Sequence, residues 1–323
     1  MSSAWSFGLK LIVALLPCFR IVEISKSGKI DEKNKGNLAS GISDPLTKAD
    51  LESHKILTSS IRSSFPDVAL ISEEKDHAKD THAMVPPSIP PIDLAVIMHA
   101  LSSLKMDSVD HEDVVVWIDP LDATKEFTQG LEEYVTVMAC IVISGIPVGG
   151  IVHFPFQRRT MWAWAAASKQ EGGGVRNFTL PGGSPWPQAL HEDTWSSNGA
   201  RIIVSRSHAG SVETDARNAG VKVRAVTPAG GSGYKVAEVL TGAQDVYMHS
   251  TIIKKWDICA GDALLRAEAG SAAGEWEGGI RDWHGEEVRY GQHDPVKLTN
   301  GLVATRSAEL YSKLQPHLSS IKS

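Results

Sequence analysis

The pattern of apolar and polar positions divides the chain into a helical segment, a β-rich middle and an alternating C-terminal part. Residues 47–65 carry apolar side chains at Leu57, Ile61 and Phe65 with polar residues between them, a spacing that predicts a helix. Between 114 and 167, runs rich in branched and aromatic residues are separated by Gly or Pro. Because the links between these runs are short, we expect an antiparallel sheet.

The remaining segments add loops and a second α/β region. Residues 76–91 are polar and rich in Pro, and residues 172–199 are rich in Pro and Trp, so both are expected to be loops. After residue 200, strand-like runs such as RIIVS alternate with helical runs such as GYKVAEVLTG. We therefore expect an N-terminal α+β half over 1–199 and a C-terminal α/β half over 200–323.

Composition and charge narrow the class of protein. A chain of 323 residues with 42% hydrophobic content can bury a substantial core. The net charge of -6 argues against a nucleic-acid partner, although a local basic pocket for a small phosphate ester would hardly change the total. Cys18, Cys140 and Cys259 are too few and too scattered to predict a disulfide framework. Cys140 lies in an apolar run and is expected to be a buried small hydrophobe.

The first residues resemble a membrane anchor only at first sight. Their uncharged apolar core runs from Leu11 to Phe19, well short of the roughly 20 residues that a membrane span needs. No small-residue cleavage site follows this core. We expect an amphipathic first helix that continues into residues 20–24, and a membrane anchor is not evident.

The stretch WIDPLDATKEF, residues 117–127, carries the candidate chemistry. Pro120 is expected to end the preceding strand, so that Asp119 and Asp122 project from a rigid turn. Two aspartates this close repel each other unless a cation lies between them, and together with the Leu121 carbonyl they offer hard oxygen ligands for Mg²⁺. The alternative is an Asx-turn in which each Asp accepts backbone N–H groups.

Two other acidic segments strengthen the metal hypothesis. Glu73 and Glu74 end an apolar run, and physical reasoning does not separate them as ligands. Asp257 precedes a helical run, where it could bind metal or serve as the helix N-cap. Lys254 and Lys255 could line the same pocket or form a solvated basic pair.

Three blocks in this order, ISEE, WIDPLDATKEF and KKWDICAGDALLRAEAG, resemble the signatures of the inositol monophosphatase superfamily of Mg²⁺-dependent, lithium-sensitive phosphatases. The likeness runs from about residue 26 to about residue 305. TKAD, DATKEF, IVSRSH, PAGGSGYKV and IKKWDICAG resemble the branch that acts on 3'-phosphoadenosine 5'-phosphate. YVTVMACIVISGIPVGGIVHFPF and the KKWD block are most similar to its Golgi-resident type. The resemblance implies an α/β/α/β/α sandwich with an antiparallel first sheet and a mixed second sheet.

The resemblance also implies roles for individual residues. Two or three Mg²⁺ ions would be bound by Glu73, Asp119, the Leu121 carbonyl, Asp122 and Asp257. The attacking water would be oriented and deprotonated by Asp50 and Thr124, and the nucleotide would be contacted by Ser205, His208, Gly231 and Lys235. From the residues alone, Asp50 could instead belong to a capping box with Thr47, and His208 could be an ordinary surface residue. GGSGYK lacks the pattern of a Walker A loop.

We therefore predict metal-assisted hydrolysis of the 3'-phosphate of 3'-phosphoadenosine 5'-phosphate, giving AMP and phosphate. An inositol monophosphatase, a fructose bisphosphatase and a catalytically silent nucleotide or metal sensor remain as alternatives. The Golgi-type resemblance and the sequon Asn177-Phe178-Thr179 point to the endomembrane lumen, whereas an unanchored chain would be cytoplasmic. A homodimer is left open.

Overall fold

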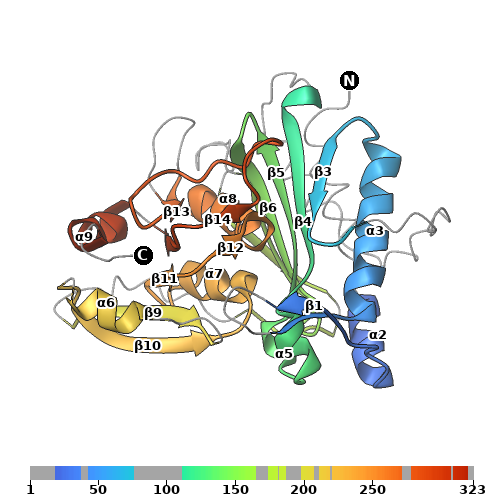
Figure 1. Ribbon diagram of the computed structural model, residues 1–323, viewed down its shortest axis with the longest axis horizontal. Coiled ribbons are helices and arrows are strands. Elements are labelled where there is room, and N and C mark those ends of the chain that lie inside the picture. Colours follow the sequence, from blue (N-terminus) through green and yellow to red (C-terminus); the bar gives the residue numbers. More distant parts are fainter. Residues whose placement is uncertain are drawn as a thin grey trace.

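The computed structural model describes residues 19–37, 43–75, 111–164, 174–180, 182–186, 198–206, 211–218, 220–270, 278–306 and 308–318. The expected loop at 76–91 lies outside these ranges. In the described part, two large sheets and two small two-stranded sheets are covered by helices (Figure 1).

The first large sheet has six strands in the order β3-β4-β5-β6-β7-β8. Its strands are β3 (Ala69–Ser72), β4 (Val114–Asp122), β5 (Thr136–Ile143), β6 (Ile146–Phe154), β7 (Arg159–Trp164) and β8 (Arg176–Thr179). Every neighbouring pair is antiparallel except β3 and β4, which are parallel. The expected antiparallel sheet is confirmed, but the expected loop at 172–199 contains the edge strand β8.

The second large sheet has five strands in the order β10-β9-β11-β15-β13. The strands are β9 (Ala200–Ser205), β10 (Val223–Ala229), β11 (Val246–His249), β13 (Gly279–Arg281) and β15 (Leu302–Thr305). β9 is parallel to β10 and to β11, whereas β15 is antiparallel to β11 and to β13. The sheet is therefore mixed, as expected.

Small elements and helices complete the chain. The two-stranded sheets pair β1 (Lys33–Asn37) with β2 (Ser43–Leu46) and β12 (Ile253–Lys254) with β14 (Lys297–Leu298). The helices are α2 (Phe19–Ser27), α3 (Lys48–Ser64), α5 (Thr124–Thr128), α6 (Val212–Asn218), α7 (Ser232–Leu240), α8 (Cys259–Ala269) and α9 (Ala308–Leu318), with 3-10 turns η2 (His111–Asp113), η3 (Glu132–Tyr134) and η5 (Lys255–Asp257). The helix expected over 47–65 is α3.

Three apolar cores lie between five layers, and the second core extends to both sides of the layer formed by α7 and α8. Side chains that alternate along β4 point to opposite faces of the first sheet. Val116 packs with α2 and α3, whereas Trp117 packs with α7, α8 and the inner face of the second sheet. The outer face of the second sheet packs with α6 and α9 through residues such as Val212 and Leu314. The result is the expected α/β/α/β/α sandwich (Figure 1).

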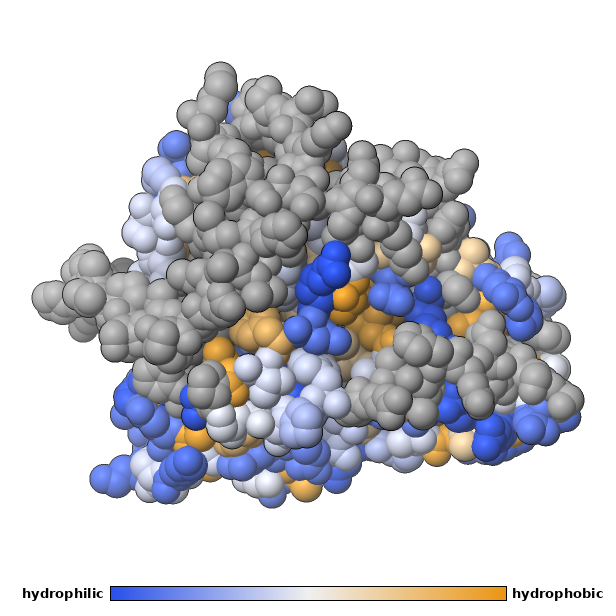
Figure 2. Space-filling view, turned by 180° about the vertical axis from the view of Figure 1, so that it is seen from behind, coloured by the Kyte–Doolittle hydropathy of each residue, from blue (hydrophilic) through white to orange (hydrophobic). Residues whose placement is uncertain are grey.

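The surface of the described part is mixed. Figure 2 shows hydrophilic positions along the lower edge of one face and hydrophobic positions near its middle. Among the described residues, Ile252 is the large hydrophobic side chain that is exposed, at 46%. No helix in the described ranges combines the length and the apolar character needed to cross a bilayer.

Candidate active site

A bulge at the end of β4 presents the two aspartates of the DPLD turn. Asp119 lies opposite Met138 of β5 and Asp122 lies opposite Thr136, so β4 contains one more residue than β5 across this step. The expectation that Pro120 ends the strand is wrong, because a bulge accommodates a residue without an N–H group. The Leu121 N–H donates to Asp119 Oδ1 at 3.2 Å, so the alternative of an Asx-turn holds for Asp119.

The turn then enters α5 through a residue in an unusual conformation. Ala123 has a φ of 71° and a ψ of 41°, in the left-handed region. This conformation costs a residue with a Cβ about 1–2 kcal/mol. Ala123 lies between β4 and α5, which begins at Thr124, and the hydroxyl of Thr124 lies 3.1 Å from the Leu121 carbonyl oxygen of the DPLD turn.

Burial and mutual repulsion perturb the carboxyls of this site. Asp119 and Asp257 are buried, and loss of hydration raises the pKa of each well above its usual range. The charge of Glu73 is the next contribution to both pKa values, and the charge of Asp122 also raises both. This electrostatic link gives Glu73 a physical connection to the cluster that the sequence could not provide.

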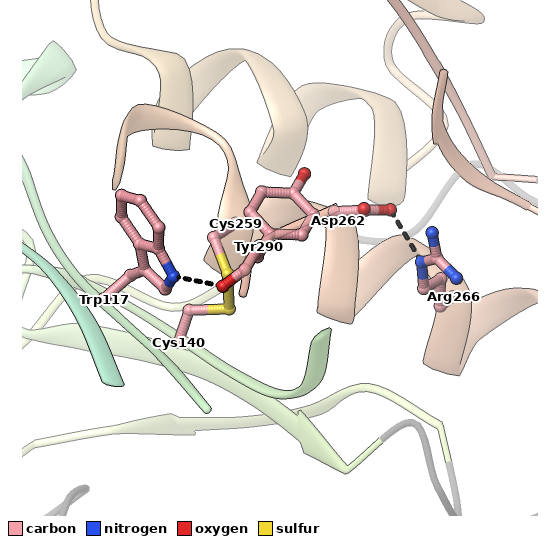
Figure 3. Close-up of a disulfide and its surroundings, with 6 residues drawn as sticks. All are labelled: Trp117, Cys140, Cys259, Asp262, Arg266 and Tyr290. Atoms are coloured by element: carbon pink, nitrogen blue, oxygen red, sulfur yellow. Dashed lines mark hydrogen bonds and ion pairs between the residues drawn. A yellow bond between two sulfur atoms is a disulfide. The ribbon is translucent and has the colours of Figure 1, made fainter. Parts of the chain in front are cut away.

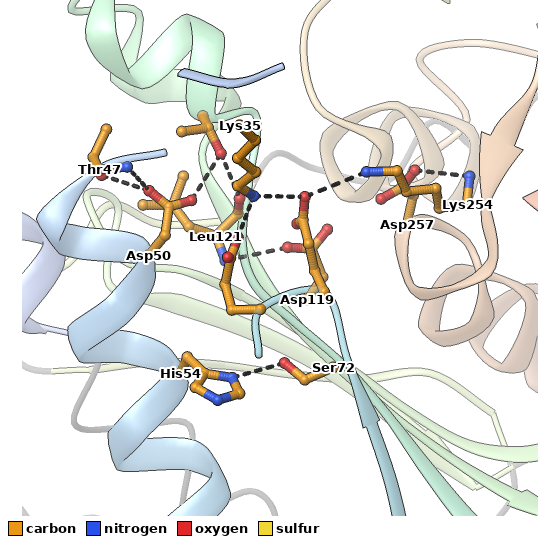
Figure 4. A network of polar contacts seen from close by, with 12 residues as sticks. Lys35, Thr47, Asp50, His54, Ser72, Asp119, Leu121, Lys254 and Asp257 are labelled. Atoms are coloured by element: carbon orange, nitrogen blue, oxygen red, sulfur yellow. Dashed lines mark hydrogen bonds and ion pairs between the residues drawn. The ribbon is translucent and has the colours of Figure 1, made fainter. Parts of the chain in front are cut away.

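Two lysines lie among these acids (Figure 4). Lys35 Nζ, from β1, is 3.1 Å from Glu73 Oε1 and also contacts Glu74 Oε1, while Lys254 Nζ is 3.8 Å from Glu73 Oε1. Burial lowers the pKa of Lys35, but the charges of Glu73 and Glu74 outweigh it and hold the pKa above its usual value.

The acids are neighbours without forming a complete metal shell. Within the part of the chain that the structure describes, no three Asp, Glu, His or Cys side chains stand in ligand geometry around one point. The carboxyls nevertheless perturb one another's pKa values, and the ammonium of Lys35 is paired with two of the acids. The described site is therefore a cluster of acids in which Lys35 and Lys254 lie beside Glu73.

Asp50 and Thr124, the expected water-activating pair, are in direct contact. Thr124 Oγ1 donates to Asp50 Oδ1 at 2.9 Å and also lies 3.1 Å from the Leu121 carbonyl oxygen. Thr47 donates to Asp50 Oδ2 from its N–H at 2.8 Å and from its hydroxyl at 2.5 Å. Asp50 therefore serves with Thr47 in the capping box of α3 (Figure 4). It also binds Thr124.

Burial sets the acidity of Asp50. Its side chain is fully inaccessible, and the loss of hydration raises the pKa of its carboxyl to about 7, although the hydrogen bonds from Thr47 favour the charged form. A carboxyl with a pKa in this range can take up a proton near neutral pH.

A glycine turn packs against the DPLD turn from the second half of the chain. Asp122 Oδ2 accepts hydrogen bonds from Thr136 Oγ1 at 2.9 Å and from the Gly233 N–H, in the first turn of α7, at 2.8 Å. Gly231 has a φ of 59°, and a Cβ there would lie 2.5 Å from the Tyr134 carbonyl oxygen. Only glycine fits this approach, so the expected GGSGYK turn borders the acids directly.

Lys235 lies behind this turn. Its side chain is buried, its ammonium donates to the Gly231 carbonyl, and it stands 5.0 Å from the centre of the Tyr247 ring. Burial lowers the pKa of Lys235 to about 8, against the opposing charges of Asp122 and Glu126. In this arrangement its direct bond is to the backbone of the turn.

The other expected residues are placed as follows. Ser205 ends β9 opposite Ala229 at the end of β10, beside the glycine turn. His208 lies outside the described residues. Asp257 is in η5, where it accepts the Lys254 N–H at 3.2 Å. The N-cap of α8 is Ile258, so the alternative of Asp257 as that N-cap is wrong.

The fold places the neighbouring residues Lys254 and Lys255 in different surroundings. Lys254 approaches Glu73, whereas Lys255 is buried, with its ammonium 6.0 Å from the centre of the Tyr290 ring. The interpretation as a solvated pair is therefore wrong for Lys255.

A disulfide joins Cys140 of β5 to Cys259 of α8 (Figure 3). No motif in the sequence indicates a bond between two cysteines 119 residues apart. The packing of α8 against the first sheet brings them together, and it requires glycine in β6: a Cβ at Gly150 would lie 2.3 Å from the Ala260 carbonyl oxygen. Cys140 is buried as expected, but the expectation that it is simply a small hydrophobe is wrong.

Several polar residues at the site were not found by sequence reasoning. Lys35 is one basic residue in a polar segment, and only the hairpin of β1 and β2 places it beside Glu73. Glu126 and Arg206 meet at 3.8 Å across the two halves of the chain. No spacing in the sequence signals either contact, because both depend on how the two sheets pack.

Comparison with solved structures identifies the architecture. The described fold is similar to a Thermotoga maritima IMPase, with a TM-score of 0.63, 18% sequence identity and coverage of 99% of this chain and 98% of that chain. It is also similar to CysQ from Bacteroides thetaiotaomicron, a bacterial member of the inositol monophosphatase family, with a TM-score of 0.60, 22% identity and coverage of 93% and 97%. The five layers are those of the inositol monophosphatase fold.

The chain belongs to the inositol monophosphatase family, whose model matches residues 18–322. Among curated relatives, the Golgi-resident adenosine 3',5'-bisphosphate 3'-phosphatase of Mus musculus is 34% identical over 91% of this chain and 76% of its own length. Inositol monophosphatase 3 of Danio rerio is 36% identical over 77% of this chain and 68% of its own length. Sequence identity alone therefore does not decide which of the two activities named for these relatives this chain shares.

Proposed function

We propose that this protein hydrolyses the 3'-phosphate of 3'-phosphoadenosine 5'-phosphate to give AMP and inorganic phosphate. The observation that carries the proposal is the contact of Thr124 with Asp50 beside the Asp119–Asp122 turn. This arrangement supports activation of a water next to a cluster of oxygen ligands. The names of the Golgi-resident relatives support the choice of a bisphosphate nucleotide as substrate.

The residues of the cluster fit Mg²⁺ by their chemistry. They offer carboxylate oxygens and one backbone carbonyl. Burial first, and then the neighbouring charges of Glu73 and Asp122, raise the pKa values of Asp119 and Asp257, and a bound cation would relieve the repulsion between these charges. We assign two or three ions to Glu73, Asp119, the Leu121 carbonyl, Asp122 and Asp257. When bound, Mg²⁺ supplies charge neutralisation for the ester oxygens and a more acidic water.

The protein groups supply proton transfer and orientation. The hydroxyl of Thr124 can accept a hydrogen bond from the attacking water while it donates to Asp50 Oδ1. As the water attacks, Thr124 would take the proton of the water and pass its own hydroxyl proton to Asp50 Oδ1, because burial keeps the pKa of Asp50 near neutrality and Thr47 fixes its other oxygen. Ser205, His208 and the Gly231 turn are proposed to contact the nucleotide, and Lys235 is proposed to support this turn.

We place the protein in the Golgi or another endomembrane lumen. The Golgi-resident relatives support this compartment, and so does the disulfide, because disulfides persist in oxidising compartments and are rare in the cytosol. The sequon asparagine, Asn177, is exposed on the edge strand β8, where a glycan could be attached.

A substrate panel tests the activity. We expect Mg²⁺-dependent phosphate release from the bisphosphate nucleotide with a higher kcat/KM than from inositol 1-phosphate or fructose 1,6-bisphosphate. Asp119→Asn should lower kcat by orders of magnitude. Asp113 is exposed and directly precedes β4, so the control substitution Asp113→Asn should leave kcat unchanged. Preference for inositol 1-phosphate would instead support the activity named for the Danio rerio relative. Absence of metal-dependent release from every ester would support the silent sensor.

A further inference from the structure

Arg206 lies at the edge of the candidate site against the side chains of Tyr134 and Glu126, which we call the platform. It follows β9, and its N–H donates to the Ala229 carbonyl at 3.0 Å. Its guanidinium lies 5.7 Å from the centre of the Tyr134 ring, and its Nη1 is 3.8 Å from Glu126 Oε1. The side chain remains 36% exposed, so the guanidinium is oriented by its neighbours and still open to solvent.

The contact to Glu126 leaves the guanidinium able to bind an anion. A separation of 3.8 Å is an ion-pair distance but exceeds that of a hydrogen bond. Burial raises the pKa of Glu126, while the charges of Lys235 and Arg206 lower it. A guanidinium has five N–H donors in a planar fork that matches phosphate oxygens, and one ring face and one distant carboxyl do not use them up.

A short series of contacts connects this platform to the acids. A Cβ at Gly230 would lie 2.5 Å from Glu126 Cγ and 2.9 Å from Tyr134 Cγ, so the glycine turn rests directly on both platform residues. One residue further, a Cβ at Gly231 would lie 3.1 Å from Asp122 Oδ2. Arg206 is therefore separated from the DPLD turn by one layer of side chains and the glycine turn.

The position also suits a ligand-binding edge. β9 and β10 are parallel, and both Arg206 and the glycine turn follow their carboxyl ends. Ligands of α/β sheets bind at this edge. Two other cations of the site have closer partners, since Lys35 is paired with Glu73 and Glu74 and Lys235 donates to the Gly231 carbonyl. Lys254 lies on the metal-site side, 3.8 Å from Glu73.

We propose that Arg206 binds the second, non-reacting phosphate of the substrate and thereby selects bisphosphate nucleotides over monophosphates. This role rests on the proposed function, because only a substrate with two phosphates would use it. The acids and their metal ions would hold the phosphate that is cleaved, and the guanidinium on Tyr134 would hold the other. Charge-assisted contacts of this kind are geometrically specific because the fork of arginine pairs with two phosphate oxygens.

The test compares two substrates that differ only in the second phosphate, 3'-phosphoadenosine 5'-phosphate and 3'-AMP. We expect Arg206→Gln to lower kcat/KM for the bisphosphate about 10- to 100-fold, mainly by raising KM, because hydrogen bonds to charged groups contribute this much. The value for 3'-AMP should change no more than in Arg224→Gln, a matched control at an exposed position of β10. Arg206→Lys keeps the charge without the fork and should fall between wild type and Arg206→Gln.

The possible results separate this inference from the proposed function. Equal losses on both substrates would overturn it, because Arg206 would then support the fold or contact a part that the substrates share. An unchanged kcat/KM for the bisphosphate would overturn it as well. A wild-type protein that does not hydrolyse the bisphosphate would refute the proposed function itself, before any variant is measured. Should Arg206→Gln fail to fold, the same substrate ratio in Arg206→Lys decides.

Discussion

Replacing both Cys140 and Cys259 by alanine removes the covalent link between β5 and α8, and the structure gives the size of the expected effect. The bond closes a loop of 119 residues. In the chain-entropy treatment, closing a loop of this length raises the free energy of the unfolded chain by about 5 kcal/mol at 25 °C. Loss of a native disulfide typically lowers the free energy of unfolding by about 2 to 5 kcal/mol. A domain is usually stable by only about 5–15 kcal/mol, so the loss is a large fraction of the total.

Urea unfolding of the wild type and of the double alanine variant measures this difference as a shift of the midpoint at constant slope. A thiol count on the denatured protein tests the link itself. The chain has three cysteines, so one thiol should react before reduction and three after it. Cys18→Ala is the matched control, with no reactive thiol before reduction and two after it.

The link should also affect the site. Cys259 follows Asp257 by two residues, and Cys140 lies opposite Trp117 on β4, the strand that carries Asp119. We therefore expect the double variant to need more Mg²⁺ for half-maximal thermal stabilisation, because the two segments that we propose to bind the metal are then held only by packing. Three reactive thiols in the unreduced wild-type protein would refute the link. An intact link with an unchanged urea midpoint would refute the energetic reasoning.

Two other predictions concern the carboxyl of Asp50 and the compartment. The pKa of Asp50 is raised from 3.8 to about 7 in the folded protein, so the folded state binds the extra proton, and the stability of the metal-free protein should fall as pH rises between these values and level off above them. Asp50→Asn should make this fall of stability shallower in urea unfolding measured with a chelator, while Asp119 and Asp257, whose pKa values are also raised, keep the rest of it. Parallel wild-type and variant curves would contradict the assignment. If the protein resides in the endomembrane lumen, endoglycosidase treatment should lower its mass and Asn177→Gln should abolish that change, since Asn177 is exposed on β8. An unchanged mass in protein isolated from a secretory cell would count against a glycan at this site.

Local sequence predicted the elements that depend on local physics. The helix spacing at 47–65 became α3, and the branched, Gly-separated runs after 114 became β4 to β7. These predictions succeeded because periodicity reports which face of an element is buried. Prediction was weaker where a rule has an exception. Pro120 did not end β4, because a bulge removed the need for its missing N–H.

For the candidate site, too, local sequence predicted some features and not others. The sequence by itself determined the acidic residues, their order and, through resemblance, the family and the expected five-layer sandwich. Only the tertiary structure decided that Asp50 both caps α3 and binds Thr124, that Lys35 lies between Glu73 and Glu74, and that Cys140 and Cys259 are bonded. Such contacts join segments far apart in the chain. They are set by how the layers pack, which no local pattern of residues encodes.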